Sequence, residues 1–254
     1  MLRRSLPAAA AVVLLLVLWQ GICMLRLVPQ YMLPSPAQVV QAFWSDRALL
    51  WQNSIITLQE AFLGLFFGVL TGFAAAVVMD SCTLLYSAFY PLLVITQTIP
   101  SVAVAPLLVL WFGYDMLPKI ILIVVSAFFP VTVGLLDGFR SVDKDAVNLL
   151  RSMGANRRQI FRFLKFPSAL PQLFSGLKIA AAYSVVGAVI SEWLGGFGGL
   201  GVYMTRVKKA FAFDKMFAVI FLVSAISLAL MALVRLAEKK CMPYRKPTDN
   251  KQEE

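Results

Sequence analysis

The decisive stretch of this sequence reads Asn148-Leu-Leu-Arg-Ser-Met-Gly154-Ala and, after eight further residues, Leu164-Lys-Phe-Pro167. It lies in the one long polar segment of an otherwise apolar chain, from Arg140 to Gln172, which holds seven basic residues and two acidic ones. Glycine interrupts helices and proline restricts how they continue. We therefore expect a basic loop in which Gly154 separates two short helices and Pro167 ends the second.

The composition around this loop predicts a helical membrane protein. Of the 254 residues, 60% are hydrophobic and 14% are charged, whereas a soluble domain carries roughly 25% charged residues. Apolar runs recur that are long enough to cross a bilayer core of ~30 Å as helices. The expected fold is an all-α polytopic membrane protein with a single membrane domain over residues 1–254 and no soluble catalytic domain.

Charge and cysteine usage exclude several classes of function. The net charge is +10, but the basic residues lie between and after apolar runs, which favours a role in membrane topology over nucleic-acid binding. Cys23, Cys82 and Cys241 show no metal-ligand spacing, and histidine is absent. We expect no catalytic residue, no metal site and no cofactor in this chain.

Six membrane spans can be drawn along the sequence. The first, which begins with Met1-Leu-Arg-Arg and an apolar run, could also be a secretory signal. Its apolar character continues to Val28 and more spans follow, which favours an uncleaved span. The expected spans cover residues 7–28, 53–79, 84–113, 117–139, 173–195 and 214–235.

The distribution of lysine and arginine predicts the orientation. With the N-terminus inside, the inner segments hold fifteen basic residues (two, seven and six) and the outer segments hold four (one and three). Positive residues collect on the cytoplasmic side, so both termini and the 140–172 loop are expected in the cytoplasm.

Two segments depart from plain membrane helices. Leu33-Pro-Ser-Pro36 is a helix-start pattern, with Ser35 as the cap and Pro36 in the first turn, and it predicts a short helix on the outer face. Pro91, Pro100 and Pro106 predict a third span that is kinked at each proline. Its polar residues Thr96, Gln97 and Ser101 either line a substrate path or bond back to their own helix turn.

Small residues recur every four positions in the second span, at Gly64, Gly68, Gly72 and Ala76, and in the fifth, at Gly176, Ala180, Ser184 and Ala188. Such rows let helices approach closely. The approach could occur within one subunit or between two subunits.

Glu60 and Glu192 border these rows and are therefore expected to face protein, toward the outer side of the membrane. Ionisable residues inside spans usually have a partner or a role. They could line an outer vestibule for substrate, or they could be protonated or bond to a neighbouring helix.

The glycine spacing of Gly196-Phe-Gly198-Gly-Leu-Gly201 matches the pattern of dinucleotide-binding sites. That pattern requires a preceding strand, whereas here a membrane helix precedes it. We interpret it as a flexible outer loop. No phosphate-binding loop occurs in the sequence, so ATP chemistry would have to come from another chain.

The 140–172 loop resembles the loop signature of ABC-importer permeases of the branch for sulfonates, nitrate, taurine and thiamine-pyrimidine precursors. That signature reads Glu-Ala-Ala, three residues, Gly, nine residues, an aliphatic residue, any residue, an apolar residue and Pro. Gly154, Leu164, Phe166 and Pro167 match it, whereas Asn148-Leu-Leu stands in place of Glu-Ala-Ala. Three further matches keep their order along the chain: Leu33-Pro-Ser-Pro36, Pro100 to Gly113, and Gly199-Leu-Gly201.

The resemblance implies a six-span permease that works as a homodimer in the bacterial inner membrane, with two copies of a cytoplasmic ATPase and an external binding protein. The loop would then be a coupling loop whose apolar face sits in a groove of the ATPase. The simpler alternative is a loop whose charges only set topology. The coupling residues implied are Asn148, Leu149, Leu150, Arg151, Met153, Gly154, Ala155, Leu164 and Pro167.

The substrate suggested by the resemblance is a thiamine pyrimidine precursor or a similar heteroaromatic molecule. Ser191 to Gly196 and Leu149 to Ala155 look most like permeases for that precursor, and Glu60 stands where relatives that import anions carry arginine. The alternatives are a sulfonate, nitrate or taurine. A further alternative, from another class, is an ion-coupled secondary transporter that uses Glu60 and Glu192.

Overall fold

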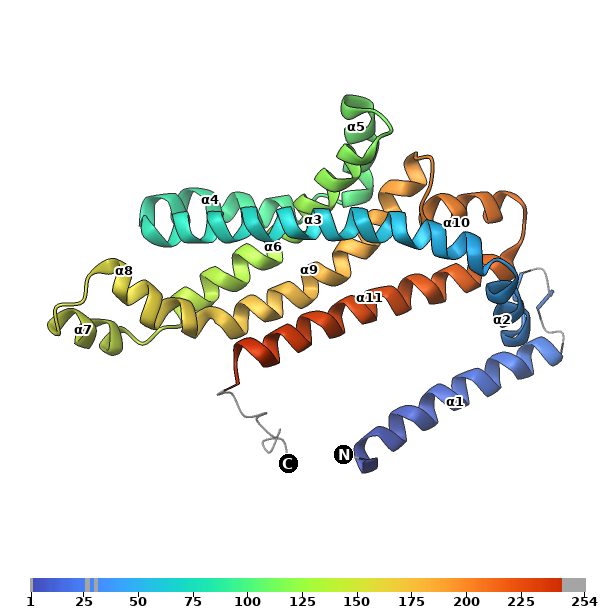
Figure 1. Ribbon diagram of the computed structural model, residues 1–254, viewed down its shortest axis with the longest axis horizontal. Coiled ribbons are helices and arrows are strands. Elements are labelled where there is room, and N and C mark those ends of the chain that lie inside the picture. Colours follow the sequence, from blue (N-terminus) through green and yellow to red (C-terminus); the bar gives the residue numbers. More distant parts are fainter. Residues whose placement is uncertain (1, 26–27, 30–31, 244–254) are drawn as a thin grey trace.

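A computed structural model describes residues 2–25, 28–29 and 32–243, and the part of the chain that it describes is built from helices joined by short connections (Figure 1). Long helices lie side by side, with α7 and α8 at one end of the molecule and α2 and α10 at the other. In chain order the helices are α1 (Leu2–Met24), α2 (Pro36–Ser45), α3 (Arg47–Ser81), α4 (Thr83–Thr96), α5 (Ser101–Phe112), α6 (Met116–Arg140), α7 (Lys144–Ser152), α8 (Arg157–Ile160), the π-helical turn η1 (Phe161–Lys165), α9 (Phe166–Leu194), α10 (Leu200–Lys209) and α11 (Phe213–Cys241).

Four helices are long and apolar enough to cross a membrane. They are α3, α6, α11 and the continuous helix Arg157–Leu194, which joins α8, η1 and α9; the bent pair α4–α5 gives a fifth. Helix α1 contributes a shorter apolar stretch, Ala10–Met24. The all-helical membrane fold is thus confirmed, and the count of six spans is approximate. The first predicted span extended to Val28, but α1 ends at Met24, and residues 26–27 lie outside the described part.

The centre of the bundle is α6, which packs between α3 and α9. Gly64, Gly68 and Gly72 of α3 lie against α6, where added side chains would collide with Ile123, Ala127 or the Phe128 carbonyl. On the other side, a side chain at Gly176 of α9 would collide with the Pro130 carbonyl. Both rows of small residues therefore serve close packing within one chain, which is the first of the two alternatives.

The third predicted span is interrupted only at Pro100. Helices α4 and α5 meet there at 95°, whereas Pro91 and Pro106 lie inside α4 and α5. The break of the third span is therefore confirmed at Pro100, and Pro91 and Pro106 do not separate helices. Gln97 and Thr98 close a tight turn by donating to the carbonyls of Val94 and Ile95. Proline then disfavours helical geometry at the residue before it, so the chain must change direction.

Helix α2 begins as the sequence predicted. The Ser35 hydroxyl accepts from the Gln38 N–H at 3.3 Å, and the Gln38 side chain accepts from the Ser35 N–H at 2.8 Å, which completes a capping box. At the following corner Asp46 accepts from Tyr203 at 2.6 Å and from Lys215 at 2.8 Å. Burial opposes ionisation of Asp46, but these bonds lower the pKa of its carboxyl below the usual value. This corner ties α10 and α11 to the start of α3.

Candidate functional site

The loop between α6 and α9 contains the predicted interruption at Gly154. Helix α7 ends at Ser152, and Gly154 has φ +84°, a conformation that favours glycine. Gly154 N–H donates to the Arg151 carbonyl and Ala155 N–H to the Leu150 carbonyl, each at 2.9 Å. These bonds satisfy the last carbonyls of α7 and turn the chain toward α8. The separation of two helices by Gly154 is confirmed.

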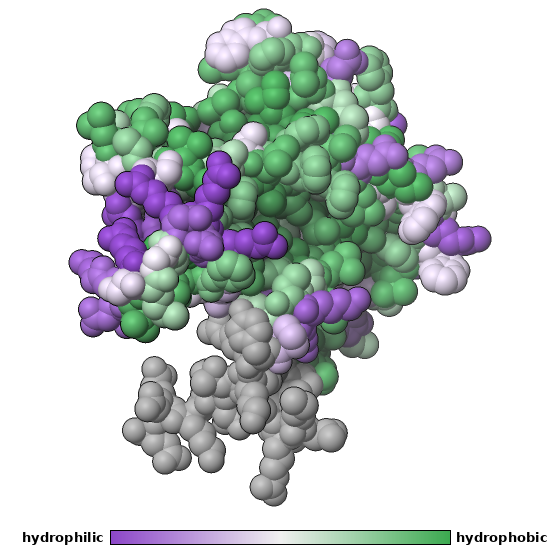
Figure 2. Space-filling model, turned by 60° about the vertical axis from the view of Figure 1, so that its left-hand side comes forward, coloured by the Kyte–Doolittle hydropathy of each residue, from purple (hydrophilic) through white to green (hydrophobic). Residues whose placement is uncertain are grey.

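Helix α7 presents bulky apolar side chains to its surroundings. Leu149 is 63% exposed and Met153 is 74% exposed, and residues four apart share a helix face. Leu150 and Ala155 are half-buried, while Asn148 and Arg151 are exposed. Hydrophilic side chains gather at this end of the molecule, beside a largely hydrophobic surface (Figure 2). An exposed apolar face within a basic surface is typical of a helix that docks on another protein.

Pro167 does not end the second loop helix, so that prediction was wrong. Helix α8 continues through η1 into α9, and Pro167 lies in the first turn of α9. The π-helical turn explains this continuity: the Phe166 N–H donates to the Phe161 carbonyl, five residues back. Locally wider helical spacing accommodates a residue that has no N–H of its own. Leu164 is half-buried in this turn.

A groove lined mainly by apolar side chains, with a few polar ones among them, runs along α6 and α9 beside the α4–α5 bend. It consists of two adjoining cavities of about 450 and 500 Å³ that share Gln97 and Tyr183. Thr96, Gln97 and Ser101, the candidates from the third span, all line the second cavity. Thr96 and Gln97 are exposed and Tyr183 is 50% exposed. Thr96 also donates to the Leu93 carbonyl of its own turn at 2.7 Å, so it lines the cavity and bonds back to its helix, as the two interpretations expected.

The two acidic candidates lie elsewhere and are buried. Glu60 on α3 is 2% exposed and accepts from the Lys119 ammonium of α6 at 2.6 Å. Glu192 on α9 is 1% exposed, and it accepts from the Thr57 hydroxyl at 2.8 Å and from the Gly201 N–H at 2.5 Å. Neither residue lines the groove. In this conformation the acids join helices and do not face an open vestibule, which corresponds to the alternative of bonding to neighbouring helices.

Glu192 also explains two of the glycines that follow α9, Gly199 and Gly201. Gly199 N–H donates to the Asn53 side chain and Leu200 N–H to the Thr57 hydroxyl, each at 2.9 Å. A side chain on Gly199 would collide with the Glu192 carboxylate, and Gly199 has φ +116°. The predicted flexible loop is thus a segment held to α3 and α9 by side-chain hydrogen bonds. Gly199 and Gly201 lie close to the Glu192 carboxylate, whereas a side chain at Gly195, Gly196 or Gly198 would meet Tyr114, Lys119 or Ile56.

Sequence reasoning missed four residues that contribute to these sites. Lys119 is a single cation inside the fourth predicted span, and that placement alone could have marked it as a partner for an acid. Asn53 and Thr57 precede Glu60 by seven and three residues, so their helical spacing placed all three on one face. Nothing in the sequence marked Tyr183 as a site residue, because aromatic residues are common in apolar spans.

Residues 64–242 match the family described as binding-protein-dependent transport system inner membrane component. The chain belongs to this family. A probable ABC transporter permease of Haemophilus influenzae is 38% identical, covering 89% of this chain and 93% of that protein. The formylaminopyrimidine transport permease ThiX of Halalkalibacterium halodurans is 37% identical, covering 92% and 93%.

A third relative of this permease is the riboflavin transport system permease RibX of Chloroflexus aurantiacus, which is 32% identical over 92% of the chain and 88% of the relative. Among solved structures, an amino acid ABC transporter gives a TM-score of 0.66 at 17% identity, covering 79% of the permease and 97% of that chain. The chain is therefore a membrane-spanning permease subunit of the ABC-importer family. This assignment replaces the alternative of an ion-coupled secondary transporter.

Proposed function

We propose that this permease imports a small, neutral or cationic heteroaromatic solute, most simply a pyrimidine precursor of thiamine. The observation that carries the proposal is the 37% identity to the formylaminopyrimidine permease over nearly the whole length of both chains. The relationship to a riboflavin permease points in the same direction, because flavins and pyrimidines share planar, nitrogen-containing rings.

The lining of the groove fits this substrate class. Tyr183 offers an aromatic face, while Gln97, Ser101 and Ser126 offer hydrogen-bonding groups for ring nitrogens. Asp137 is the one charged residue that lines the two cavities in the described part of the chain. A sulfonate, nitrate or taurine sulfonate would gain from a cation in its path. The groove, with a carboxylate in place of that cation, favours a neutral or cationic solute.

We also propose the partners and the orientation. Two copies of a cytoplasmic ATPase would bind the exposed face of α7, and an external binding protein would deliver the solute to a pair of identical permeases. Both termini and α7 would lie on the cytoplasmic side of a bacterial inner membrane, in line with the positive loops. Leu149 and Met153 supply the apolar contact surface for the ATPase.

The helix from Arg157 to Leu194 suggests how the two ends of the permease communicate. Its 38 residues correspond to roughly 57 Å of helix. One end adjoins α7 through the Gly154 turn, and the other carries Glu192, which holds the outer glycine segment. A tilt of this single helix on ATP binding would therefore move the outer segment together with the loop.

The substrate assignment is tested by uptake into proteoliposomes that contain the permease, its ATPase and its binding protein. Replacement of Tyr183 by alanine should reduce uptake of formylaminopyrimidine by about tenfold, because an aromatic contact is lost. Replacement by phenylalanine keeps the ring and should leave most uptake. The binding of the ATPase should stay unchanged in both variants. Taurine or nitrate uptake by the wild type, without pyrimidine uptake, would refute the assignment.

The orientation is tested by thiol labelling in intact cells, in a variant whose three cysteines are replaced. A cysteine at Phe197, which is 86% exposed, should react with a membrane-impermeant reagent added outside. A cysteine at Ser152, which is exposed at the end of α7, should react only after the cells are permeabilised. The reverse pattern would show that the basic residues had been assigned to the wrong side.

A further inference from the structure

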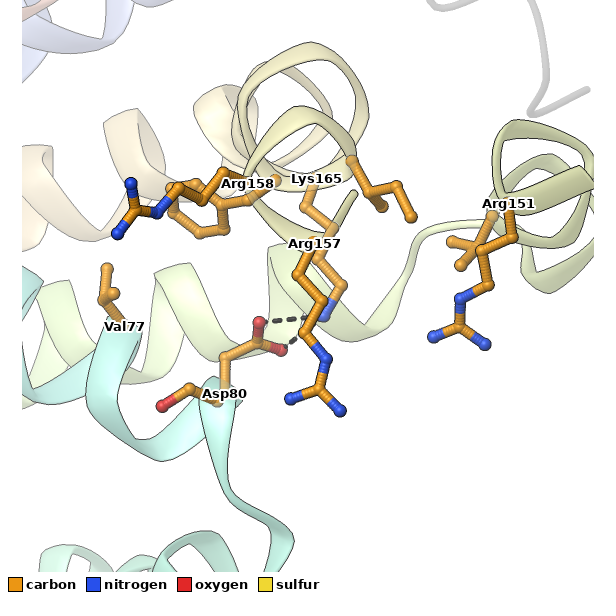
Figure 3. Close-up of a pocket in the computed structure, with 10 residues that line it drawn as sticks. Val77, Asp80, Arg151, Arg157, Arg158 and Lys165 are labelled. Atoms are coloured by element: carbon orange, nitrogen blue, oxygen red, sulfur yellow. Dashed lines mark hydrogen bonds and ion pairs between the residues drawn. The ribbon is translucent and has the colours of Figure 1, made fainter. Parts of the chain in front are cut away.

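A third cavity lies between the end of α3 and the loop helices α7 and α8, apart from the groove. Its volume is about 450 Å³, and its wall combines apolar with basic side chains (Figure 3). The lining residues are Val77, Asp80, Ser81, Val147, Arg151, Arg157, Arg158, Ile160, Phe161 and Lys165.

The charges of this cavity are unbalanced. Lys165 donates to both oxygens of Asp80 at 2.8 Å, so the single carboxylate already has its cation. Figure 3 shows Arg157 beside this pair and Arg151 across the gap on α7, with both side chains extended in the same direction. Within residues 2–25, 28–29 and 32–243, neither these two arginines nor Arg158 form a salt bridge. The cavity therefore offers guanidinium groups to an anion.

The position of the cavity indicates where such an anion would come from. Val77 and Asp80 belong to the last turns of the membrane helix α3, which ends at Ser81. The basic residues come from the loop that follows α6 and leads into α9. The cavity thus adjoins the end of a membrane span, where a lipid headgroup would be met. Its apolar wall, formed by Val77, Val147, Ile160 and Phe161, suits an amphipathic ligand.

We propose that this cavity binds the phosphate of an anionic phospholipid, with Arg151 and Arg157 as its principal ligands. Guanidinium groups recognise phosphate oxygens with paired hydrogen bonds. A lipid held there would contact the end of α3, helix α7 and helix α8 together. A lipid bound in the cavity would fix the angle of α7 relative to the spans. It would thereby stabilise the arrangement of the loop helices.

The test is lipid binding by the purified permease in a neutral detergent, measured by native mass spectrometry, which requires no transport partner. Phosphatidylglycerol should bind saturably, and the double variant Arg151→Gln/Arg157→Gln should bind it about tenfold more weakly. The matched control is Lys144→Gln/Arg162→Gln, which removes two charges from exposed positions of the same loop. Its affinity should change by less than about twofold.

Four comparisons decide the outcome. Arg151→Lys/Arg157→Lys keeps the charge but loses the paired geometry, and an intermediate affinity supports phosphate recognition. Equal weakening in the matched control would show diffuse attraction and overturn the proposal. Displacement by glycerol 3-phosphate at the same concentration as the lipid would assign the cavity to a soluble phosphate ester and overturn it. Loss of ATPase binding in Arg151→Gln/Arg157→Gln with unchanged lipid binding would assign the arginines to the protein partner.

Discussion

Replacement of Lys119 by methionine is expected to destabilise the permease by about 3 kcal/mol, because it leaves a buried carboxylate without its cation. Lys119 and Glu60 are 4% and 2% exposed, and the second oxygen of Glu60 already has no hydrogen-bond partner. The thermal unfolding midpoint in detergent should fall by about 6–10 °C. Expression of folded protein should fall with it.

The matched variant removes both charges. Glu60→Gln/Lys119→Met should recover most of the lost stability, since an uncharged pair in the same space is often tolerated as well as a buried ion pair. A single variant as stable as the wild type would mean that the ion pair does not hold α3 to α6. A double variant no better than the single one would mean that the lost lysine packing, not the stranded carboxylate, causes the effect.

Replacement of Leu149 by aspartate is expected to abolish coupling to the ATPase. Leu149 is already 63% exposed in the isolated chain, so the unfolding midpoint should barely change. In the assembly that we propose, the carboxylate would be buried against an apolar groove, which costs several kcal/mol. ATPase retained on the purified permease should fall by about 100-fold, and uptake should be lost.

The control for Leu149 is methionine at the same position, which keeps an apolar side chain of similar volume and should retain ATPase binding within about threefold. Met153→Asp should reproduce the loss, because residues four apart share the helix face. Normal ATPase retention and uptake in Leu149→Asp would contradict the proposed contact face. The loop would then serve only to set topology.

Local features of the sequence were sufficient where a few neighbouring residues decide the conformation. The Ser35-Pro36 start of α2 was predictable because a capping box involves only residues three apart. The interruption at Gly154 was predictable because a left-handed turn favours glycine. The apolar runs predicted the membrane helices, since burying backbone groups in lipid leaves few alternatives to a helix.

Predictions failed where the outcome depended on contacts outside the segment itself. Pro91, Pro100 and Pro106 carry the same chemical restriction, yet only Pro100 separates two helices. Pro167 was expected to end a helix, but the widened turn η1 lets the helix continue from Arg157 to Leu194. A proline raises the cost of a regular helix, and the packing around it decides whether the helix ends or adapts.

Hydrophobicity, charge and turn chemistry act over short stretches of chain, so the residues alone were enough to predict a helical membrane protein with a basic loop divided at a glycine, and the resemblance to a family added the permease. The roles of Glu60 and Glu192 became clear only from the packing of the helices. Their partners Lys119 and Gly201 lie on other segments, 59 and nine residues away. Which polar group satisfies a buried charge depends on how the helices pack, and that packing brings together residues whose separation along the chain gives no indication that they meet.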